Sequence, residues 1–391
     1  MADRIPEGWR ETTLDEIAFI NPPENLKNGI KAKKVTMDML IPFTKIIPTY
    51  SIEEYKGGMK FRNGDTLIAR ITPCLENGKT AYVDILDDGE IGFGSTEFIV
   101  LREKEDRSDK HFLYYFSMSP NFRDVAILSM TGSSGRQRVQ TEVVRNHLFL
   151  FPPLPEQRAI ASVLGSLDDK IDLLNRENQT LEQMAEALFR QWFIEEADEK
   201  WEQVPLDQIA DYLNGLACQK YPPKNDFEKL PVLKIRELRN GSIDGSDWAT
   251  TDVPKEYIVQ NGDVIFSWSG SLLVKMWDGA KCVLNQHLFK VTSERYPKWF
   301  YYLWTIHHIN KFISIAEGKA TTMGHIKRED LSSSIVLIPN TNEFKYMDKV
   351  ISPLIEKIIL NNSQIRTLEK LRDTLLPKLM SGEVRVKICD A

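Results

Sequence analysis

The stretch PPLPEQRAIASVLGSLDDKIDLLNRENQTLEQMAEALFRQWF, residues 152–193, decides how this chain is organised. Its prolines mark a break in regular structure, and the residues that follow them carry a regular apolar pattern. Apolar side chains recur at alternating steps of four and three, which is the spacing of a coiled-coil seam. The seam consists of Ile160, Leu164, Leu167, Ile171, Leu174, Asn178, Leu181, Ala185, Leu188 and Trp192.

A second seam with the same spacing lies near the C-terminus. Ser166 and Ser352 resemble helix N-caps, and Pro353 suits the first position of a helix, so each segment is predicted to form a short helix and then a long one. Arg372 interrupts the second seam, where the neighbouring Leu371 is an apolar alternative. The second seam consists of Met347, Ile351, Leu354, Ile358, Asn361, Ile365, Leu368, Arg372, Leu375 and Leu379.

One asparagine occupies each seam at a matching place. The seams are centred near residues 176 and 363, so helices that run antiparallel about a pseudo-two-fold axis bring Asn178 opposite Asn361. A paired asparagine fixes the register of two helices at some cost in stability. The alternative is two unrelated asparagines that tolerate solvent.

The rest of the chain also contains an internal repeat, because short motifs recur in the same order in both halves. The matching pairs are LDEIA at 14–18 with LDQIA at 206–210, NGD at 63–65 with 261–263, and LFLFP at 148–152 with IVLIP at 335–339.

This repeat predicts two copies of one α/β (α+β) domain, separated by two long antiparallel coiled-coil helices. Strand patterns follow both Asn-Gly turns, and aromatic helix patterns come later in each copy. The expected strands are 65–70, 97–101, 263–268 and 287–291, and the expected helices are 110–119 and 299–313. The predicted domains are 1–150, 151–197, 198–340 and 341–391.

The composition is that of an ordinary globular protein, with 42% hydrophobic and 27% charged residues among 391. The sequence contains neither an apolar run of 18 residues nor an N-terminal secretory signal, so no membrane span is expected. Its four cysteines are widely spaced, which favours a reducing cytoplasm. The net charge is −6, but residues 151–199 alone carry 4 basic and 11 acidic side chains, and the two domains are near neutral.

The helical segments resemble the conserved regions of type I restriction-modification specificity subunits. The resemblance rests on PPLPEQR at 152–158, DDKID at 168–172, ALFRQWF at 187–193 and LLPKLMSG at 375–382, with TGSSGRQRV at 131–139 and MGHIK at 323–327 near the domain ends. It covers nearly the whole chain. The second copy departs from the pattern, because EQR at 156–158 is replaced by EFK at 343–345, and this puts the contacts of that motif in doubt.

The resemblance implies a division of labour among several subunits. Each recognition domain would read one half of a split double-stranded DNA site, and the paired helices would dock two modification subunits and the restriction subunits. Those partners would carry S-adenosylmethionine, ATP and Mg, and this chain would hold no cofactor or metal and catalyse nothing. The predicted long helix, near 167–193, is roughly 40 Å long, which equals about 12 base pairs.

Catalytic motifs are missing from the sequence. Asn21-Pro22-Pro23 imitates a methyltransferase motif, but Glu24 stands where an aromatic residue must stack a flipped base, so a turn is the better interpretation. The sequence contains no phosphate-binding loop with the Gly-x-x-x-x-Gly-Lys-Ser/Thr pattern and no Gly-x-Ser-x-Gly elbow.

Base readout needs Arg, Lys, Asn or Gln side chains, supported by phosphate contacts. In the first domain we expect these from the flexible loop near 131–139, from a lysine cluster and from the end of a strand; the alternative for the loop is a solvated loop without a ligand. The candidates are Lys31, Lys33, Lys34, Arg70, Lys79, Ser133, Ser134, Arg136, Gln137 and Arg138.

The second domain offers the aligned positions. Trp268 is alternatively a core residue at a strand end. The candidates are Lys220, Lys224, Trp268, Ser269, Lys319, Thr321, Thr322, His325 and Lys327.

Phe189, Trp192 and Phe193 are candidate docking residues for a partner, unless they belong to the core. Two other functions compete with a specificity subunit. A stand-alone DNA-binding regulator would need its own basic surface, and near-neutral domains argue against it. A coiled-coil scaffold protein gives no reason for two large, divergent domains.

Overall fold

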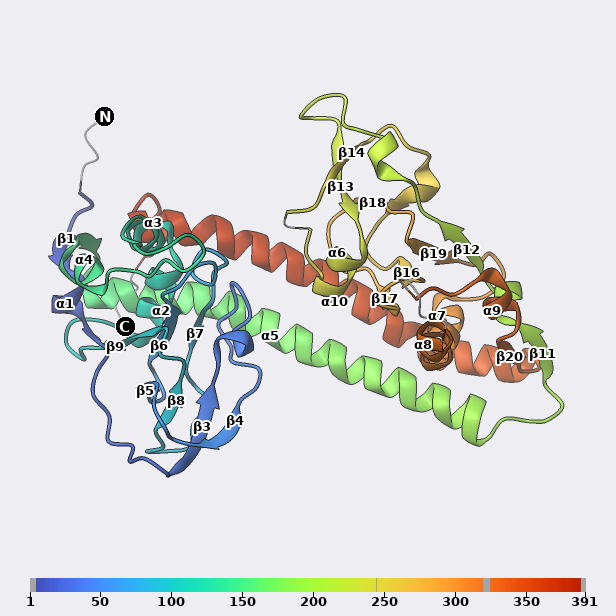
Figure 1. The fold of residues 1–391 in the computed structure, drawn as a ribbon, viewed down its shortest axis with the longest axis horizontal. Coiled ribbons are helices and arrows are strands. Elements are labelled where there is room, and N and C mark those ends of the chain that lie inside the picture. The colour runs from blue at the N-terminus through green and yellow to red at the C-terminus, as the bar shows by residue number, and fades with distance from the viewer. Residues whose placement is uncertain (1–4, 244, 319–323, 388–391) are drawn as a thin grey trace. The chain divides into compact units, whose positions relative to one another are not determined.

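The computed structural model describes residues 5–243, 245–318 and 324–387 (Figure 1). Their contacts divide the chain into two compact units. Unit 1 contains the described residues of 1–171 and 368–391, and unit 2 contains those of 172–367. Each unit therefore joins one α/β head to part of two long helices, α5 (Leu154–Arg190) and α10 (Thr341–Ser381).

The head of unit 1 contains two four-stranded sheets and one strand pair. The first sheet has the order β2 (Ala18–Ile20), β9 (Phe98–Glu103), β6 (Thr66–Ala69), β7 (Thr80–Tyr82). The second has the order β4 (Ser51–Glu54), β3 (Lys31–Val35), β8 (Gly92–Gly94), β5 (Met59–Phe61). The pair is β1 (Arg10–Thr13) with β10 (Leu148–Phe151). The helices are α1 (Leu14–Ile17), η1 (Met37–Met39), α2 (Lys110–Met118), α3 (Pro120–Leu128) and α4 (Thr141–Asn146).

The head of unit 2 has the same kinds of sheet. The first has the order β12 (Asp211–Asn214), β19 (Leu288–Thr292), β16 (Val264–Ser267), β17 (Leu273–Met276). The second has the order β14 (Trp248–Thr250), β13 (Lys229–Leu233), β18 (Cys282–Leu284), β15 (Ile258–Val259). The pair is β11 (Glu202–Pro205) with β20 (Ile335–Ile338). The helices are η2 (Gln191–Glu195), η3 (Leu206–Gln208), η4 (Cys218–Lys220), α6 (Ile235–Asn240), η5 (Lys255–Tyr257), α7 (Lys298–His307), α8 (Ile309–Gly318) and α9 (Arg328–Ser332).

The two heads share one strand topology. Both first sheets are antiparallel throughout, and both second sheets contain one parallel pair, β3 with β8 and β13 with β18. The four strands expected from the sequence are present as β6, β9, β16 and β19. The helix expected at 299–313 is divided, because α7 ends at His307 and α8 begins at Ile309.

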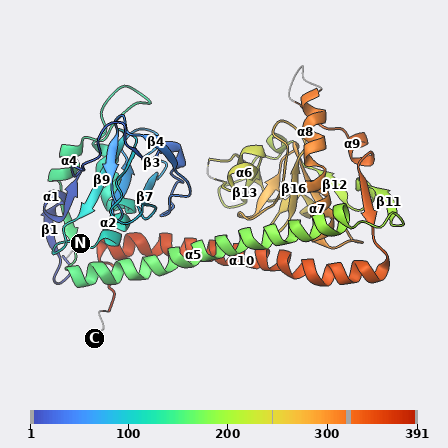
Figure 2. The same cartoon turned by 90° about the horizontal axis from the view of Figure 1, so that it is seen from below.

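An aromatic helix forms the centre of each core. In unit 1, α2 buries Phe112, Tyr115 and Phe116 among the first sheet, the strand pair and the helix segments. In unit 2, α7 buries Trp299 and Trp304 in the same way. Figure 2 shows α7 beside the α5 segment of its unit. The aromatic faces of these helices are therefore core faces.

The long helices are continuous, which corrects the predicted division into short and long helices. Neither Ser166 nor Ser352 is an N-cap, because their hydroxyls donate to groups inside the helix, the Val163 carbonyl and the Asp348 carboxylate. Pro353 accordingly lies within α10 and not at its first turn. The actual cap of α10 is Asn340, whose side-chain oxygen accepts from the backbone of residues 342 and 343.

Candidate nucleic-acid interface

A backbone clip joins the loop at 131–138 to the end of β6 in unit 1. The Thr72 N–H donates to the Gln137 carbonyl over 3.0 Å, and the Val139 N–H donates to the Arg70 carbonyl over 2.9 Å. The clip brings Ile71 opposite Arg138. The glycine-containing loop is thereby held at one end against a buried strand.

Unit 2 contains the same clip at the end of β16. The Gly270 N–H donates to the Gly324 carbonyl over 2.9 Å, and the Ile326 N–H donates to the Trp268 carbonyl over 3.1 Å. Ser269 lies opposite His325. The backbone pattern therefore makes Trp268 the equivalent of Arg70, and His325 the equivalent of Arg138.

A third position completes the correspondence. Glu97 and His287 each precede the strand that pairs with the clipped one, as shown by the registers Ala69 with Phe98 and Ser267 with Leu288. The preceding turns match as well, because the Ser95 hydroxyl accepts from the Glu97 N–H at 3.1 Å and the Asn285 side chain accepts from the His287 N–H at 3.4 Å. We call these three positions the loop base: Arg70, Glu97 and Arg138 in unit 1, and Trp268, His287 and His325 in unit 2.

The loop base of unit 1 is a charged cluster. The Glu97 carboxylate accepts from Arg70 Nε at 3.1 Å and from Arg138 Nε and Nη2, the latter at 2.7 Å. The side chains of Arg70, Glu97 and Arg138 are 32%, 21% and 45% exposed, so the cluster faces solvent. Hydrogen bonds from Arg138 and then from Arg70 lower the pKa of Glu97 and keep it ionised near neutral pH. Two guanidiniums on one carboxylate leave a net positive charge there.

The loop base of unit 2 is instead built from rings. The Trp268 ring centroid lies 6.1 Å from that of His287 and 6.4 Å from that of His325. Trp268 Nε1 donates to the Asn214 side chain over 3.0 Å, which fixes the orientation of the indole. Its face also packs at 5.7 Å on the ring of Phe289. The same backbone positions thus carry indole and imidazole rings in place of two guanidiniums and a carboxylate.

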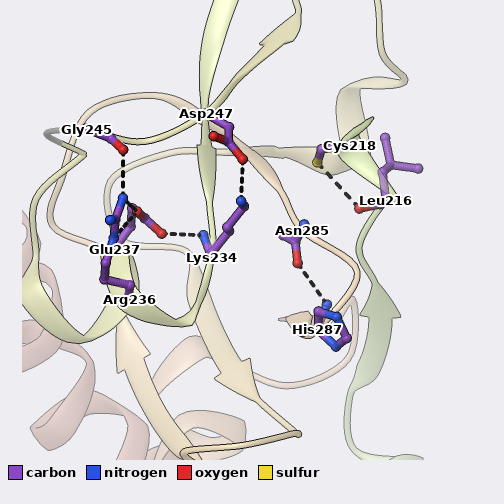
Figure 3. A network of polar contacts seen from close by, with 9 residues as sticks. All are labelled: Leu216, Cys218, Lys234, Arg236, Glu237, Gly245, Asp247, Asn285 and His287. Carbon is purple, nitrogen blue, oxygen red and sulfur yellow. Dashed lines mark hydrogen bonds and ion pairs between the residues drawn. The ribbon is translucent and has the colours of Figure 1, made fainter. Parts of the chain in front are cut away.

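A polar network continues from this loop base into the second sheet of unit 2 (Figure 3). His287 lies beside Asn285, which with Cys218, Lys234, Asp247 and other residues lines a hollow of about 250 Å³. Lys234 forms an ion pair with Asp247 across this hollow.

The lysine cluster predicted in unit 1 is divided, because side chains alternate along β3 and Lys34 lies on the face opposite to Lys31 and Lys33. Lys33 is only 11% exposed and pairs with Asp87 and Glu90 at 3.0 and 2.9 Å. Lys34 pairs with Glu53, and Lys31 is exposed. A further correction concerns Lys79, whose ammonium donates to the Met37 carbonyl over 2.7 Å. These contacts give Lys33 and Lys79 structural roles.

The loop of unit 1 is exposed, as expected. Ser133, Ser134 and Arg136 all face solvent, and Gln137 is half-buried. The Arg136 side chain has no hydrogen-bond or ionic partner in the ranges that the structure describes. These residues stay candidates for phosphate or base contacts.

The other candidates in unit 2 differ in exposure and in their partners. Lys220 and Lys327 are exposed, and Lys224 is exposed but pairs with Asp252 at 2.6 Å. Ser269 is buried, and its hydroxyl lies 3.2 Å from His287 Nδ1, so it supports the loop base and does not itself face a ligand. Three candidates, Lys319, Thr321 and Thr322, lie outside the described residues.

The two seam asparagines meet within unit 2. Asn361 Nδ2 donates to Asn178 Oδ1 at 2.9 Å, and Asn178 Nδ2 donates to Asn362 Oδ1 at 2.7 Å. Asn361 Nδ2 also lies 3.0 Å from a Glu177 carboxylate oxygen. The contact has the register expected from the seam centres, and its role in specifying that register stays a prediction.

The docking assignment is wrong for two of the three aromatic residues at the end of α5. Phe189 and Phe193 are buried and pack on the ring of Trp304 at 5.1 and 5.5 Å. Unit 2 uses them in its core because the apolar stripe of α5 faces α7 there. Trp192 is half-buried against the exposed Tyr346, and it stays a docking candidate.

The motif at residue 156 explains how each head is attached to its helix. Trp9 Nε1 donates to Glu156 over 3.0 Å in unit 1, and Trp201 Nε1 donates to Glu343 over 2.8 Å in unit 2. The contact of the glutamate is therefore retained in the second copy. The Asn21 backbone N–H donates to the Val100 carbonyl, and its side-chain oxygen accepts from the Val100 N–H. Asn21 therefore has a structural role in a turn.

Sequence reasoning missed Glu97 and His287. Each lies between a turn and an apolar strand, and neither belongs to a basic motif. The available signal was the strand register: because β6 and β9 are adjacent and antiparallel, the residue before β9 lies next to the residue after β6.

No helix in the described ranges is both long and apolar enough to cross a bilayer.

Comparison with known proteins agrees with the repeated architecture. The family model described as type I restriction modification DNA specificity domain matches twice, at residues 6–183 and 198–370. The chain belongs to this family. Its role is therefore DNA recognition and not bond chemistry.

Two curated relatives and one solved structure illustrate this membership. The type I restriction enzyme MjaIX specificity subunit of Methanocaldococcus jannaschii is 27% identical over 71% of this chain and 69% of its own length. The EcoAI specificity subunit of Escherichia coli is 34% identical over 51% of this chain, but the match covers only 36% of that relative. A crystal structure of the S subunit from M. genitalium has the same fold, with a TM-score of 0.58 and 14% identity over 97% of this chain and 98% of the other.

Proposed function

We propose that this specificity protein reads a split DNA site, one half with each head. The single observation that carries the proposal is that two heads of identical strand order present chemically different loop bases. One surface on two heads would recognise the same sequence twice, whereas two different surfaces recognise an asymmetric site. The runner-up functions, a stand-alone regulator and a scaffold, do not need this difference.

We further propose that α5 and α10 form an antiparallel coiled coil with a pseudo-two-fold axis, which holds the two half-sites a fixed distance apart. The seam spacing and the Asn178–Asn361 contact support this arrangement. The helices would also dock two modification subunits and the restriction subunits, with S-adenosylmethionine, ATP and Mg on those partners. Assembly would take place in the cytoplasm.

The proposal is tested by sequencing the methylome of cells that produce this chain together with its modification partner. We expect one split motif, methylated on adenine, whose two halves have different sequences. An active partner with an unmethylated genome, or a continuous or palindromic motif, would contradict the proposal.

Helix length provides a second test of the spacer. Seven-residue insertions of the seam pattern, one in α5 after Ile171 and one in α10 before Leu368, lengthen the pair by roughly 10 Å. We expect the gap between the half-sites to grow by about 3 base pairs, with both half-sequences unchanged. An unchanged gap would exclude the helices as the spacer.

A further inference from the structure

We propose that the loop base is the specificity-determining position of each head, and that in unit 1 Arg70 reads a guanine there with Glu97 as its positioning residue. The proposal deepens the proposed function and rests on it. It assigns a base class to one half-site, which follows from the contacts of three side chains.

The geometry of Arg70 suits guanine. Its Nε donates to Glu97, and its two terminal nitrogens have no partner among the described residues. A guanidinium fork whose two terminal donors point away from an anchoring carboxylate is the group that binds guanine O6 and N7 together in the major groove. Lysine has a similar charge but cannot make this planar two-point contact.

Glu97 orients the Arg70 side chain. A solvent-exposed arginine ordinarily samples many rotamers, and ordering it on binding costs free energy. Glu97 holds Arg70 from one side and Arg138 from the other before DNA arrives. Its lowered pKa keeps it ionised, so this support persists at neutral pH.

The backbone clip holds the loop base more firmly than the exposed part of the loop that contains Arg136. The Arg70 backbone donates to the Glu97 carbonyl and accepts from the Val139 N–H, and the Arg138 backbone exchanges two hydrogen bonds with Thr131. Arg136, by contrast, lies on the exposed part of the loop. A site on regular, hydrogen-bonded backbone holds its side chains more accurately than a mobile loop does. Base readout therefore belongs to the loop base, and Arg136 is suited to a phosphate.

Unit 2 lacks this guanidinium cluster at its loop base. Trp268, His287 and His325 occupy the three equivalent places, and no ion pair of the Arg70–Glu97 kind is formed between them. The half-site read by unit 2 is accordingly set by other groups. Changes at the loop base of unit 1 should leave that half-site unaltered.

The test uses the complex with its modification partner and compares Arg70→Lys with Arg145→Lys. Arg145 is a matched control on the same head, because it is 33% exposed and pairs with Asp15 at 3.1 Å. In the methylome, we expect Arg70→Lys to relax one guanine position of one half-site, with a loss of discrimination of roughly 5- to 150-fold. Arg145→Lys should leave the motif unchanged.

Glu97→Gln separates positioning from folding. We expect discrimination at the same guanine to fall, while binding to non-specific duplex is unchanged or tighter because a negative charge is lost. A structural role would lower both together. Thermal unfolding of each variant, measured beside the wild type, checks that the head is intact.

A third measurement changes the DNA. Replacing the assigned guanine by 7-deazaguanine removes N7, and we expect weaker binding by the wild type and no further loss with Arg70→Lys. Three results would overturn the guanine assignment but not the proposed function. They are an unaltered motif with Arg70→Lys, a uniform loss at every position, and a wild type that is insensitive to 7-deazaguanine at every guanine. A wild-type chain that directs no split methylation would overturn the proposed function instead.

Discussion

Units 1 and 2 have the same strand order but different chemistry at equivalent places. At the loop base, unit 1 has two arginines around a glutamate, and unit 2 has a tryptophan and two histidines. At the start of the long helices, Gln157 donates to the Arg107 and Pro152 carbonyls, whereas Phe344 stacks on Trp299. The backbone hydrogen bonds that define the fold are satisfied in both units, so the side chains that fill the same positions are free to diverge.

The largest expected effect is the loss of stability when a core side chain of either unit is truncated. Phe193→Ala should lower the free energy of unfolding by about 3–5 kcal/mol, because the side chain is 1% exposed and packs on the aromatic rings of α7. Met380, which lies 187 residues later in the core of unit 1, should cost about 2–5 kcal/mol when changed to Ala. Chemical denaturation measures both. A Phe193→Ala variant of normal stability that fails to bind a partner would restore the docking assignment.

The next effect concerns the seam of unit 2. Asn361→Leu should destabilise the protein by about 1–3 kcal/mol, because it leaves Asn178 buried without that partner. The double change Asn178→Leu with Asn361→Leu should recover much of this loss, since two apolar side chains then face each other. A double-mutant cycle in urea measures the coupling. Additive effects would show that the pair does not act as a unit.

A smaller effect separates base contacts from phosphate contacts. Arg136→Ala should weaken binding to all sequences alike and reduce the slope of log affinity against log salt by about 1. Titrations of specific and non-specific duplex at several salt concentrations measure this slope. Relaxed specificity with an unchanged slope would assign Arg136 to a base, and unchanged binding of Arg136→Ala with Arg138→Ala would exclude the loop.

The smallest effect is the pH dependence that Glu97 contributes to the stability of unit 1. The folded-state pKa of Glu97 lies below its ordinary value of 4.5, so its ion pairs stabilise the head above the unfolded pKa. That stabilisation is lost as the pH falls through the folded pKa. Thermal unfolding between about pH 6 and pH 3 should therefore show less acid sensitivity in Glu97→Gln than in the wild type. Equal sensitivity would mean that the cluster contributes nothing to stability.

Periodicity and repetition predicted the duplicated heads, the two long helices, four strands and the Asn178–Asn361 contact, because apolar periodicity reports directly on which face of an element is buried. The coiled coil with a pseudo-two-fold axis stays a prediction. The helix starts were predicted wrongly at Ser166 and Ser352, since a serine inside a helix can bond to groups within it as readily as it can cap a new one.

The candidate site was predicted less completely. Arg70 and Arg138 were found from residue type, but Glu97 was not, because only the pairing of β6 with β9 brings an acidic residue between two basic ones. Lys33 and Lys79 were assigned to DNA because the sequence does not reveal that the fold already binds their ammonium groups, Lys33 through carboxylates and Lys79 through a backbone carbonyl.

The division of the chain between the units has a consequence for synthesis. Unit 2 is continuous from residue 172 to 367, whereas unit 1 needs residues beyond 367 to complete its core, where Leu379 and Met380 pack and Arg385 binds Glu156. The head that leaves the ribosome first is thus the last to be finished. A chain that terminates soon after residue 367 would carry an intact second head and an incomplete first one. Proteolysis of this truncated product would therefore begin in the N-terminal head, although the missing residues are C-terminal.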